Sequence, residues 1–218
     1  MTSAKPTIGE GIYTAADAAR ILKIPYSRAI YWFNYYVKAR LGDKHQYYFI
    51  VNDIIAVNFL TLIEMVVFYK LKERGVKSKN IRKAHTIMSE CLGTPYPFAH
   101  KAVFALGKDG LYFEHFGNFL SSTDGVQTAF EQVVVPFSEK IEFSKDGVAA
   151  KYYPLGKKSS IVVNPKNQFG QPVIEGTNIL TETILMLHRG KEPISSICEL
   201  YGLSRKNVRD AIAFGSAA

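Results

Sequence analysis

Small and apolar residues near the amino terminus recur at helical spacing and predict two short helices joined by a tight turn. The first helix covers Thr14 to Leu22, with Thr14 as N-cap and Asp17 at the third helical position. Pro25 cannot continue this helix, and Ser27 is expected to cap the second one. Two short helices joined in this way are typical of a helix-turn-helix.

A turn and then a strand are predicted after the second helix. Residues 42–44 favour the turn and residues 46–50 have strong strand propensity, so together they form a candidate wing. Asp53 is expected to cap a long helix that ends before Gly75. This helix is apolar on nearly all sides, so it must be covered on most of them, either by a second subunit or by the central part of the chain. The candidate residues of a dimer interface are Phe59, Ile63 and Val67.

The next helix and the central region show two different patterns. Ser78 is expected to cap a helix that ends near Gly93. Residues 102–116 and 140–153 have the pattern of two hairpins, which flank a helix that follows Asp124. The inward-facing residues of the helix that starts at Ser78 are expected to be Ile81, Ala84, Met88 and Cys91.

Three short helices are predicted near the carboxyl terminus. The first covers residues 181–189 and is ended by Gly190, and the second covers residues 194–201 and is ended by Gly202. Ser204 is expected to cap the third. Short helices with tight, glycine-containing turns again give a helix-turn-helix-like outline.

Together these elements predict an α+β protein that is mainly helical and has three domains. Residues 1–98 form a winged helix-turn-helix, and residues 99–158 form a small β-β-α-β-β unit. Residues 159–218 form a three-helix domain, and the stretch 154–160 is a plausible linker before it.

The distribution of charge changes this picture, because nearly all of the net charge lies in the first domain. The chain has 27 Lys and Arg against 19 Asp and Glu, a formal charge of +8. Residues 1–100 hold 14 of the basic and 7 of the acidic residues, whereas residues 101–159 hold 7 of each. Residues 160–218 hold 6 basic and 5 acidic residues. This distribution favours a polyanion-binding module at the amino terminus.

Catalysis and membrane insertion find little support in the sequence. The five histidines have no metal-ligand spacing, and no nucleophile or phosphate-binding motif is present, so we expect no enzyme, cofactor or metal. The two cysteines form no CxxC pair and fit a reducing compartment. The most apolar stretch is too short and too polar to span a bilayer, and the amino terminus is not a signal peptide. A cytoplasmic protein is expected.

The first hundred residues resemble the winged helix-turn-helix of the MerR family of DNA-binding proteins. The resemblance implies DNA binding by the second helix and the wing. One departure lies in the wing, where Tyr47 stands in place of the arginine that the family usually carries. The matching segments are Tyr13 to Leu22, Pro25 to Trp32, Gln46 to Ile54 and Lys72 to Val76.

The last sixty or so residues look like the C-terminal domain of VapB-type antitoxins of bacterial toxin–antitoxin pairs. Asn178 stands where that family commonly has arginine. With both ends taken together, the chain resembles full-length members of the group, which implies a toxin partner with a PIN-like ribonuclease fold and repression of the shared operon. The matching segments are Asn164-Pro165, Gly170 to Ile174, Gly176 to Ile179, Ile197 to Tyr201 and Val208 to Ile212.

Basic and polar residues of the first domain are the candidates for DNA binding. Binding requires cations at phosphates and a few polar side chains at base edges. The alternative for either basic cluster is a solvated surface, and the aromatic residues of the second helix are expected to be core rather than base-stacking groups. The candidates are Arg20, Lys23, Ser27, Arg28 and Tyr31 around the recognition helix, Lys44, His45 and Gln46 at the wing tip, and Lys77 and Lys79 after Gly75.

The C-terminal domain is nearly neutral, and phosphate neutralisation supplies much of DNA affinity, so we expect protein contact there instead. Its cations could pair with the clustered carboxylates of a ribonuclease active site or serve self-association; the alternative is surface solubility. The candidates for toxin or self-contact are Arg189, Arg205, Lys206 and Arg209.

We therefore expect an antitoxin that forms a homodimer, binds operator DNA through residues 10–85, represses its own operon and neutralises a ribonuclease toxin by protein contact. The alternative is a MerR-like transcription regulator that senses a small ligand in its central α+β domain.

Overall fold

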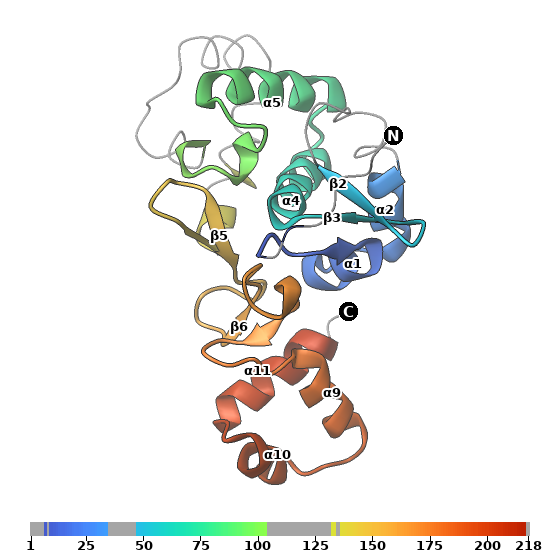
Figure 1. Ribbon diagram of the computed structural model, residues 1–218, viewed down its shortest axis with the longest axis vertical. Coiled ribbons are helices and arrows are strands. Elements are labelled where there is room, and N and C mark those ends of the chain that lie inside the picture. The colour runs from blue at the N-terminus through green and yellow to red at the C-terminus, as the bar shows by residue number, and fades with distance from the viewer. Residues whose placement is uncertain (1–6, 8, 35–46, 104–131, 134–135, 217–218) are drawn as a thin grey trace. The chain divides into compact units, whose positions relative to one another are not determined.

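A computed structural model describes residues 7, 9–34, 47–103, 132–133 and 136–216, and combines helices with small antiparallel sheets (Figure 1). Contacts within the chain group residues 1–59 and 151–218 into one compact unit and residues 60–150 into a second. The mixed helix and sheet content agrees with the expected α+β class. The finer division into three consecutive domains stays a prediction.

The amino-terminal part of the first unit joins two helices to a three-stranded sheet. Thr14 accepts a hydrogen bond from the backbone N–H of Asp17 (3.3 Å), whose carboxylate accepts one from the backbone N–H of Thr14 (3.0 Å), which confirms the predicted cap. The sheet is antiparallel in the order β1-β3-β2. The elements are β1 (Tyr13–Thr14), α1 (Ala15–Leu22), α2 (Tyr26–Trp32), β2 (Tyr48–Val51) and β3 (Ile54–Val57).

The turn between α1 and α2 confirms the tight connection, but the predicted cap of α2 is wrong. Lys23 ends α1 in the left-handed conformation (φ 56°), and α2 begins at Tyr26 directly after Pro25. Ser27 therefore lies inside the first turn of α2 instead of before it. Proline in an extended conformation starts this helix without a side-chain acceptor, because its ring fixes φ near the helical value.

The prediction that Asp53 caps a long helix is also wrong, because Asn52 and Asp53 form the turn of a hairpin. Both have positive φ, 49° and 62°, as a two-residue turn of type I′ requires, and asparagine and aspartate tolerate that region. Val51 pairs with Ile54 across the turn. The observed hairpin thus spans β2 and β3, whereas the predicted wing tip, Lys44, His45 and Gln46, lies outside the described residues.

The second unit contains most of a long helix, a second helix packed after it and part of a hairpin. The long helix ends before Gly75, as predicted, and the hairpin predicted over residues 140–153 is confirmed. The hairpin predicted at residues 102–116 and the helix after Asp124 lie mainly outside the described residues. The elements are α4 (Phe59–Glu73), α5 (Ser78–Leu92), the short 3-10 helix η2 (Pro97–Ala99), β4 (Ile141–Phe143) and β5 (Ala149–Tyr152).

Helix α5 follows its predicted face with two exceptions. Ile81, Ala84 and Met88 are buried, as expected from their spacing. Ser78 is the first helical residue and Lys77 precedes it, so the predicted cap lies one position too late. Cys91, predicted to face inward, is exposed in the last turn of α5, so that prediction is wrong.

The C-terminal region pairs a two-stranded sheet with three helices whose predicted bounds are confirmed. Ser204 accepts a hydrogen bond from the backbone N–H of Asn207 (3.1 Å) and so caps α11 as expected. A buried core that includes Ile184, Ile197, Val208 and Phe214 joins the helices. The elements are β6 (Ile161–Val162), the 3-10 helix η3 (Gln168–Gly170), β7 (Val173–Ile174), α9 (Thr181–Arg189), α10 (Ile194–Tyr201) and α11 (Arg205–Ser216).

Residues 154–160, which were predicted to be a linker, are connected to the C-terminal region by burial and by hydrogen bonds. Pro154 is buried, and Tyr152 exchanges backbone hydrogen bonds with Val163 (3.0 and 2.8 Å). The backbone N–H of Ser160 donates to Asp210 on α11 (2.8 Å). Residues 154–160 are therefore a folded connection, not a flexible one.

Candidate functional site

The start of α2 presents polar and aromatic side chains to solvent. Ser27 and Arg28 are exposed, and Tyr31 is 52% exposed. Ala29 and Trp32 turn the other way and are buried, so part of the aromatic content is core, as expected. This exposed face holds three of the residues that the sequence predicted for DNA binding, and that role stays a prediction.

Tyr26 belongs to the same face, although the sequence reasoning did not name it. Its side chain is 55% exposed at the first position of α2. Its spacing of three from the buried Ala29 would have predicted burial. The available signal for exposure was its place directly after Pro25, at the first position of α2, where no preceding helical turn lies beneath the side chain.

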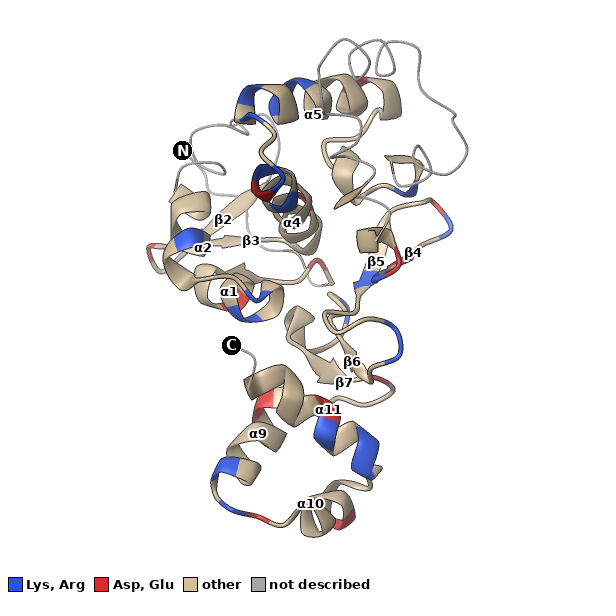
Figure 2. Cartoon of the chain, turned by 180° about the vertical axis from the view of Figure 1, so that it is seen from behind, with Lys and Arg blue, Asp and Glu red and all other residues tan. Residues whose placement is uncertain are grey.

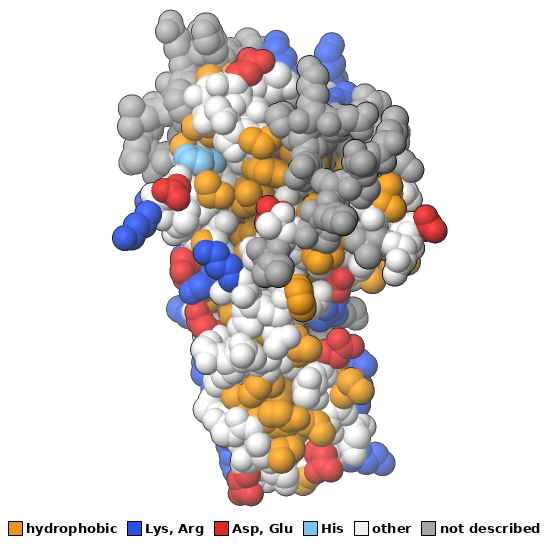
Figure 3. Space-filling model, viewed as in Figure 1, with side chains coloured by type: hydrophobic (Ala, Val, Ile, Leu, Met, Phe, Trp, Pro, Cys, Tyr) orange, Lys and Arg blue, Asp and Glu red, His pale blue; other side chains and the backbone are white. Residues whose placement is uncertain are grey.

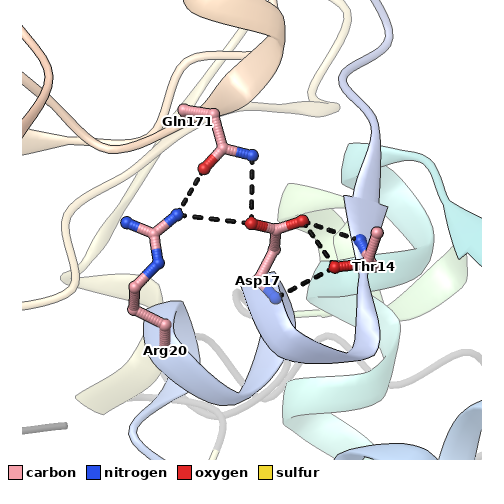
Figure 4. Close-up of polar contacts among 4 residues, drawn as sticks. All are labelled: Thr14, Asp17, Arg20 and Gln171. Atoms are coloured by element: carbon pink, nitrogen blue, oxygen red, sulfur yellow. Dashed lines mark hydrogen bonds and ion pairs between the residues drawn. The ribbon is translucent and has the colours of Figure 1, made fainter. Parts of the chain in front are cut away.

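Arg20 does not point freely into solvent, because its guanidinium contacts two polar side chains of the first unit. It lies 3.3 Å from Asp17, one turn earlier on α1, and also donates a hydrogen bond to the side-chain oxygen of Gln171. The amide nitrogen of Gln171 in turn donates to Asp17 (3.2 Å), so the three side chains form a closed network beside Thr14 (Figure 4).

Lys23 is held by the last turn of α11. Its ammonium group donates a hydrogen bond to the backbone carbonyl of Phe214 and lies 3.9 Å from the centroid of the Phe214 ring. Burial lowers the pKa of Lys23 to about 8, and the nearby charge of Arg20 acts in the same direction. Gln171 and Phe214 were not predicted here, because nothing local in the sequence connects them to residues so distant along the chain.

Lys77 and Lys79 are exposed at the start of α5, in the second unit. Basic positions gather there and at the end of α4 in Figure 2. Positive charges at the amino-terminal end of α5 interact unfavourably with the helix dipole, so Lys77 and Lys79 do not stabilise the helix by their placement. The placement leaves both interpretations of this cluster open, a solvated surface and an anion-binding one.

The cations predicted on the C-terminal helices divide into two groups. Arg189, Arg205 and Arg209 are exposed. Lys206 is exposed as well, but its ammonium group contacts Asp210 (2.6 Å) and the backbone carbonyl of Lys158 (2.9 Å). Burial alone would raise the pKa of Asp210, but hydrogen bonds from Lys206 and Ser160 outweigh it and hold that pKa below its usual range.

Apolar side chains also reach the surface of the C-terminal helices. Met186 on α9 and Leu200 on α10 are 65% and 70% exposed. Figure 3 shows hydrophobic side chains gathered on one face of this region. The sequence reasoning did not single them out, since an apolar residue in an amphipathic helix is normally assigned to the core.

The residues predicted to form a dimer interface are already covered. Phe59, Ile63 and Val67 are at most 2% exposed within the single chain. This burial favours the alternative in which the chain itself covers α4. The interface stays a prediction without support from these three side chains.

A buried ionisable pair in the second unit was missed by the sequence reasoning. Glu64 on α4 lies 2.9 Å from the ring nitrogen Nε2 of His85 on α5 and accepts a hydrogen bond from the backbone N–H of Ala99 (3.0 Å). The imidazole packs edge-on against Phe98, with ring centroids 5.2 Å apart. Burial raises the pKa of Glu64, although His85 and the backbone hydrogen bonds oppose that shift. The available signal was a charged residue within the apolar stretch from Phe59 to Phe68.

The C-terminal region also contains a polar pocket. An open pocket of about 300 Å³ is lined by polar residues that include Lys151, Asn164, Glu175 and Thr177. Glu175 lies 4.0 Å from the ammonium of Lys151 and accepts a hydrogen bond from the hydroxyl of Tyr153 (2.7 Å). Within the described part of the chain, no three His, Cys, Asp or Glu side chains gather as metal ligands, and no helix there is long and apolar enough to cross a bilayer.

Comparison with known proteins finds likeness at two levels. The family described as "Protein of unknown function (DUF433)" matches residues 161–215. Over 221 aligned residues the chain is 22% identical to a Mycobacterium tuberculosis protein named "Putative antitoxin VapB45", with 92% of each protein covered. The crystal structure of Rv2018 from Mycobacterium tuberculosis has the same fold, with a TM-score of 0.69 at 19% identity, covering 97% of this chain and 100% of that one.

Proposed function

We propose that this protein is an antitoxin that binds and neutralises a ribonuclease toxin of the PIN-like class and represses its own operon by binding DNA. One observation carries the proposal: the likeness to the protein named as an antitoxin extends over 92% of both chains. The DUF433 match at residues 161–215 adds support, since it falls on the segment that resembles antitoxins.

We assign DNA reading to α1, α2 and the β2–β3 hairpin, which together would form a winged helix-turn-helix. Residues at the start of a recognition helix contact base edges, and Ser27, Arg28 and Tyr31 are exposed there. An arginine at this position can donate two hydrogen bonds to a guanine. Lys77 and Lys79 would contact phosphates, and a homodimer would place two such modules on two half-sites.

We assign toxin contact to the C-terminal helices. The exposed Arg189, Arg205 and Arg209 would pair with clustered carboxylates, which a metal-dependent ribonuclease needs at its active site. The exposed Met186 and Leu200 would supply the apolar part of the interface. Lys206 takes a smaller part, because Asp210 and Lys158 already occupy its ammonium group.

The separation of the two roles is testable with paired substitutions. Arg28→Ala should weaken binding to the DNA upstream of the gene by about tenfold or more, because a good base contact contributes about 1–3 kcal/mol. The same variant should still rescue growth when the adjacent toxin gene is co-expressed. Arg209→Ala should show the reverse: weakened toxin binding with unchanged DNA binding. Fluorescence anisotropy and a growth assay measure the two effects.

Lys145→Ala is the matched control, since Lys145 is an exposed cation in the turn between β4 and β5. It should leave both activities unchanged. Equal loss of DNA binding in Arg28→Ala and Lys145→Ala would exclude the recognition-helix assignment. An adjacent gene that is harmless when expressed alone would contradict the antitoxin proposal itself.

A further inference from the structure

The first helix of the helix-turn-helix is joined to the C-terminal region by two separate sets of contacts. Gln171, which follows η3, bridges Arg20 and Asp17 on α1 (Figure 4). In the last turn of α11, the backbone carbonyl of Phe214 accepts a hydrogen bond from the ammonium group of Lys23, which also lies over the Phe214 ring. Both contacts lie inside one compact unit of the chain.

The contact at Lys23 has the character of a helix cap. The last four carbonyls of a helix have no donor within the helix, and Phe214 is in the last turn of α11. A cation at this end also interacts favourably with the helix dipole. Lys23 therefore satisfies a group that α11 leaves open, and this explains why a charged side chain stays in a half-buried place.

The contact at Arg20 uses both ends of one amide. The Gln171 oxygen accepts from the guanidinium, and its nitrogen donates to Asp17 (3.2 Å), so Gln171 satisfies both members of the i,i+3 ion pair. The guanidinium is thereby turned toward the C-terminal region. An isolated surface ion pair of this kind would hold the arginine only weakly.

Both cations belong to the part of a helix-turn-helix that approaches the phosphate backbone. The first helix of this motif crosses the backbone while the second enters the groove. Arg20 is in the last turn of α1 and Lys23 caps it. A phosphate would compete for the same donor groups that Gln171 and Phe214 now occupy.

We propose that the C-terminal region restrains DNA binding within its own chain by occupying Arg20 and Lys23. This inference rests on the proposed function, because it concerns the affinity of the same DNA-reading module. A protein partner that moved the end of α11 or the Gln171 segment would free both cations and strengthen binding to DNA. By linkage, bound DNA would loosen the same contacts and favour that partner to an equal extent.

The salt dependence of DNA binding tests the restraint at one contact. Each phosphate that a cation neutralises changes the slope of log K against log salt by about −0.9. Gln171→Ala should free Arg20, steepen the slope by about that amount and lose about 3.5-fold more affinity than the wild type between 50 and 200 mM salt. At low salt the variant should bind a labelled duplex from upstream of the gene more tightly than the wild type.

Two further variants identify the cation. Gln168→Ala is the matched control, because this exposed glutamine donates its side-chain hydrogen bond to the carbonyl of Asn178 and not to Asp17. It should keep the wild-type slope. Gln171→Ala combined with Arg20→Met should lose the added slope, since the freed cation is then missing. If Gln171→Ala does not fold, Gln171→Asn keeps the amide but shortens the side chain, and should show the same change.

The outcomes separate the restraint from the proposed function. A wild type that binds the duplex and a folded Gln171 variant with the same slope would overturn the restraint and leave the function standing. Failure of the wild type and every variant to bind the duplex at low salt would overturn DNA reading, and the restraint with it. A steeper slope that persists in the double variant would also overturn it, because Arg20 would not be the cation released.

Discussion

At the scale of single residues, the Glu64–His85 pair places an ionisable side chain in the buried part of the second unit. A buried carboxylate is costly unless it is paired and hydrogen-bonded, and Glu64 has both His85 and the backbone N–H of Ala99 as partners. The pair joins α4, α5 and η2, so it fixes the chain after α5 as well as the two helices.

Removal of one partner should therefore destabilise the folded chain. Glu64→Ala should lower the free energy of unfolding by about 3 kcal/mol, because His85 and the N–H of Ala99 lose their partner. Glu64→Gln should cost less, since its amide oxygen can still accept from Ala99 and no charge is buried. Urea unfolding of both variants measures the difference, and equal losses would exclude a role for the retained hydrogen bond.

The same pair gives a pH dependence whose sign follows from the raised pKa of Glu64. Its carboxyl holds a proton more readily in the folded chain than in the unfolded one. Its contribution to stability is therefore full below the unfolded pKa and declines as pH rises through the folded pKa. Relative to wild type, Glu64→Gln should thus be less destabilising at pH 7 than at pH 4 in the same unfolding measurement.

At the scale of elements, local signals predicted the ends of helices better than they predicted the strand β3. Gly75, Gly93 and Gly202 end helices where the sequence indicated, because a left-handed glycine stops a helix whatever surrounds it. Residues 54–57 are apolar and only Asn58 separates them from α4, so periodicity alone could not separate a strand from the first turn of a helix. The two positive-φ residues before them decide the structure.

The hairpin turn itself makes a discriminating prediction. Asp53→Gly should leave the free energy of unfolding unchanged or raise it by about 0.5 kcal/mol, because glycine adopts positive φ without strain. Asp53→Ser should lower it by about 1 kcal/mol, since serine is less tolerant of that conformation. If Asp53 were a helix cap, Asp53→Ser would leave stability unchanged and Asp53→Gly would lower it. A denaturant titration in which the glycine variant is less stable than the serine variant would therefore exclude the hairpin.

Contacts between distant segments were beyond the sequence reasoning. Arg20 and Lys23 were identified as cations available to DNA, and their charge and position justify that prediction. Nothing in the pattern around them indicates that Gln171 and Phe214 lie beside them, since 151 and 191 positions separate the partners. Charge along the sequence can thus locate the candidate cations, whereas their partners within the chain depend on packing that only the folded chain shows.

At the scale of the whole molecule, the two ends of the chain build one compact unit. The backbone N–H of Ile12 donates to the carbonyl of Phe169 (3.0 Å), and Gly170 packs directly against the hydroxyl of Tyr13. Any Cβ at position 170 would collide with that ring, and its φ of +85° also favours glycine. The DUF433-matched segment therefore depends on residues near the amino terminus for part of its cover.

Alanine substitutions at two glycines should distinguish the cost of a positive φ from the cost of a steric clash with Tyr13. Gly176→Ala introduces an unfavourable φ of +78° into open space and should cost about 1 kcal/mol of stability. Gly170→Ala adds a clash with Tyr13 and should cost about 3 kcal/mol. Tyr13→Phe should restore part of the loss in the Gly170 variant. Equal unfolding midpoints for the two alanine variants would show that the segments do not meet there.

The position of Phe214 near the end of the chain has a consequence for the order in which the molecule is made. A ribosome adds about 5–20 residues per second, so roughly ten to forty seconds separate the synthesis of Lys23 from that of Phe214. For that interval the nascent amino-terminal helices lack the carbonyl that holds Lys23. The arrangement at α1 thus forms only after Phe214 has been synthesised, and until then Arg20 and Lys23 lack their partners from the C-terminal region.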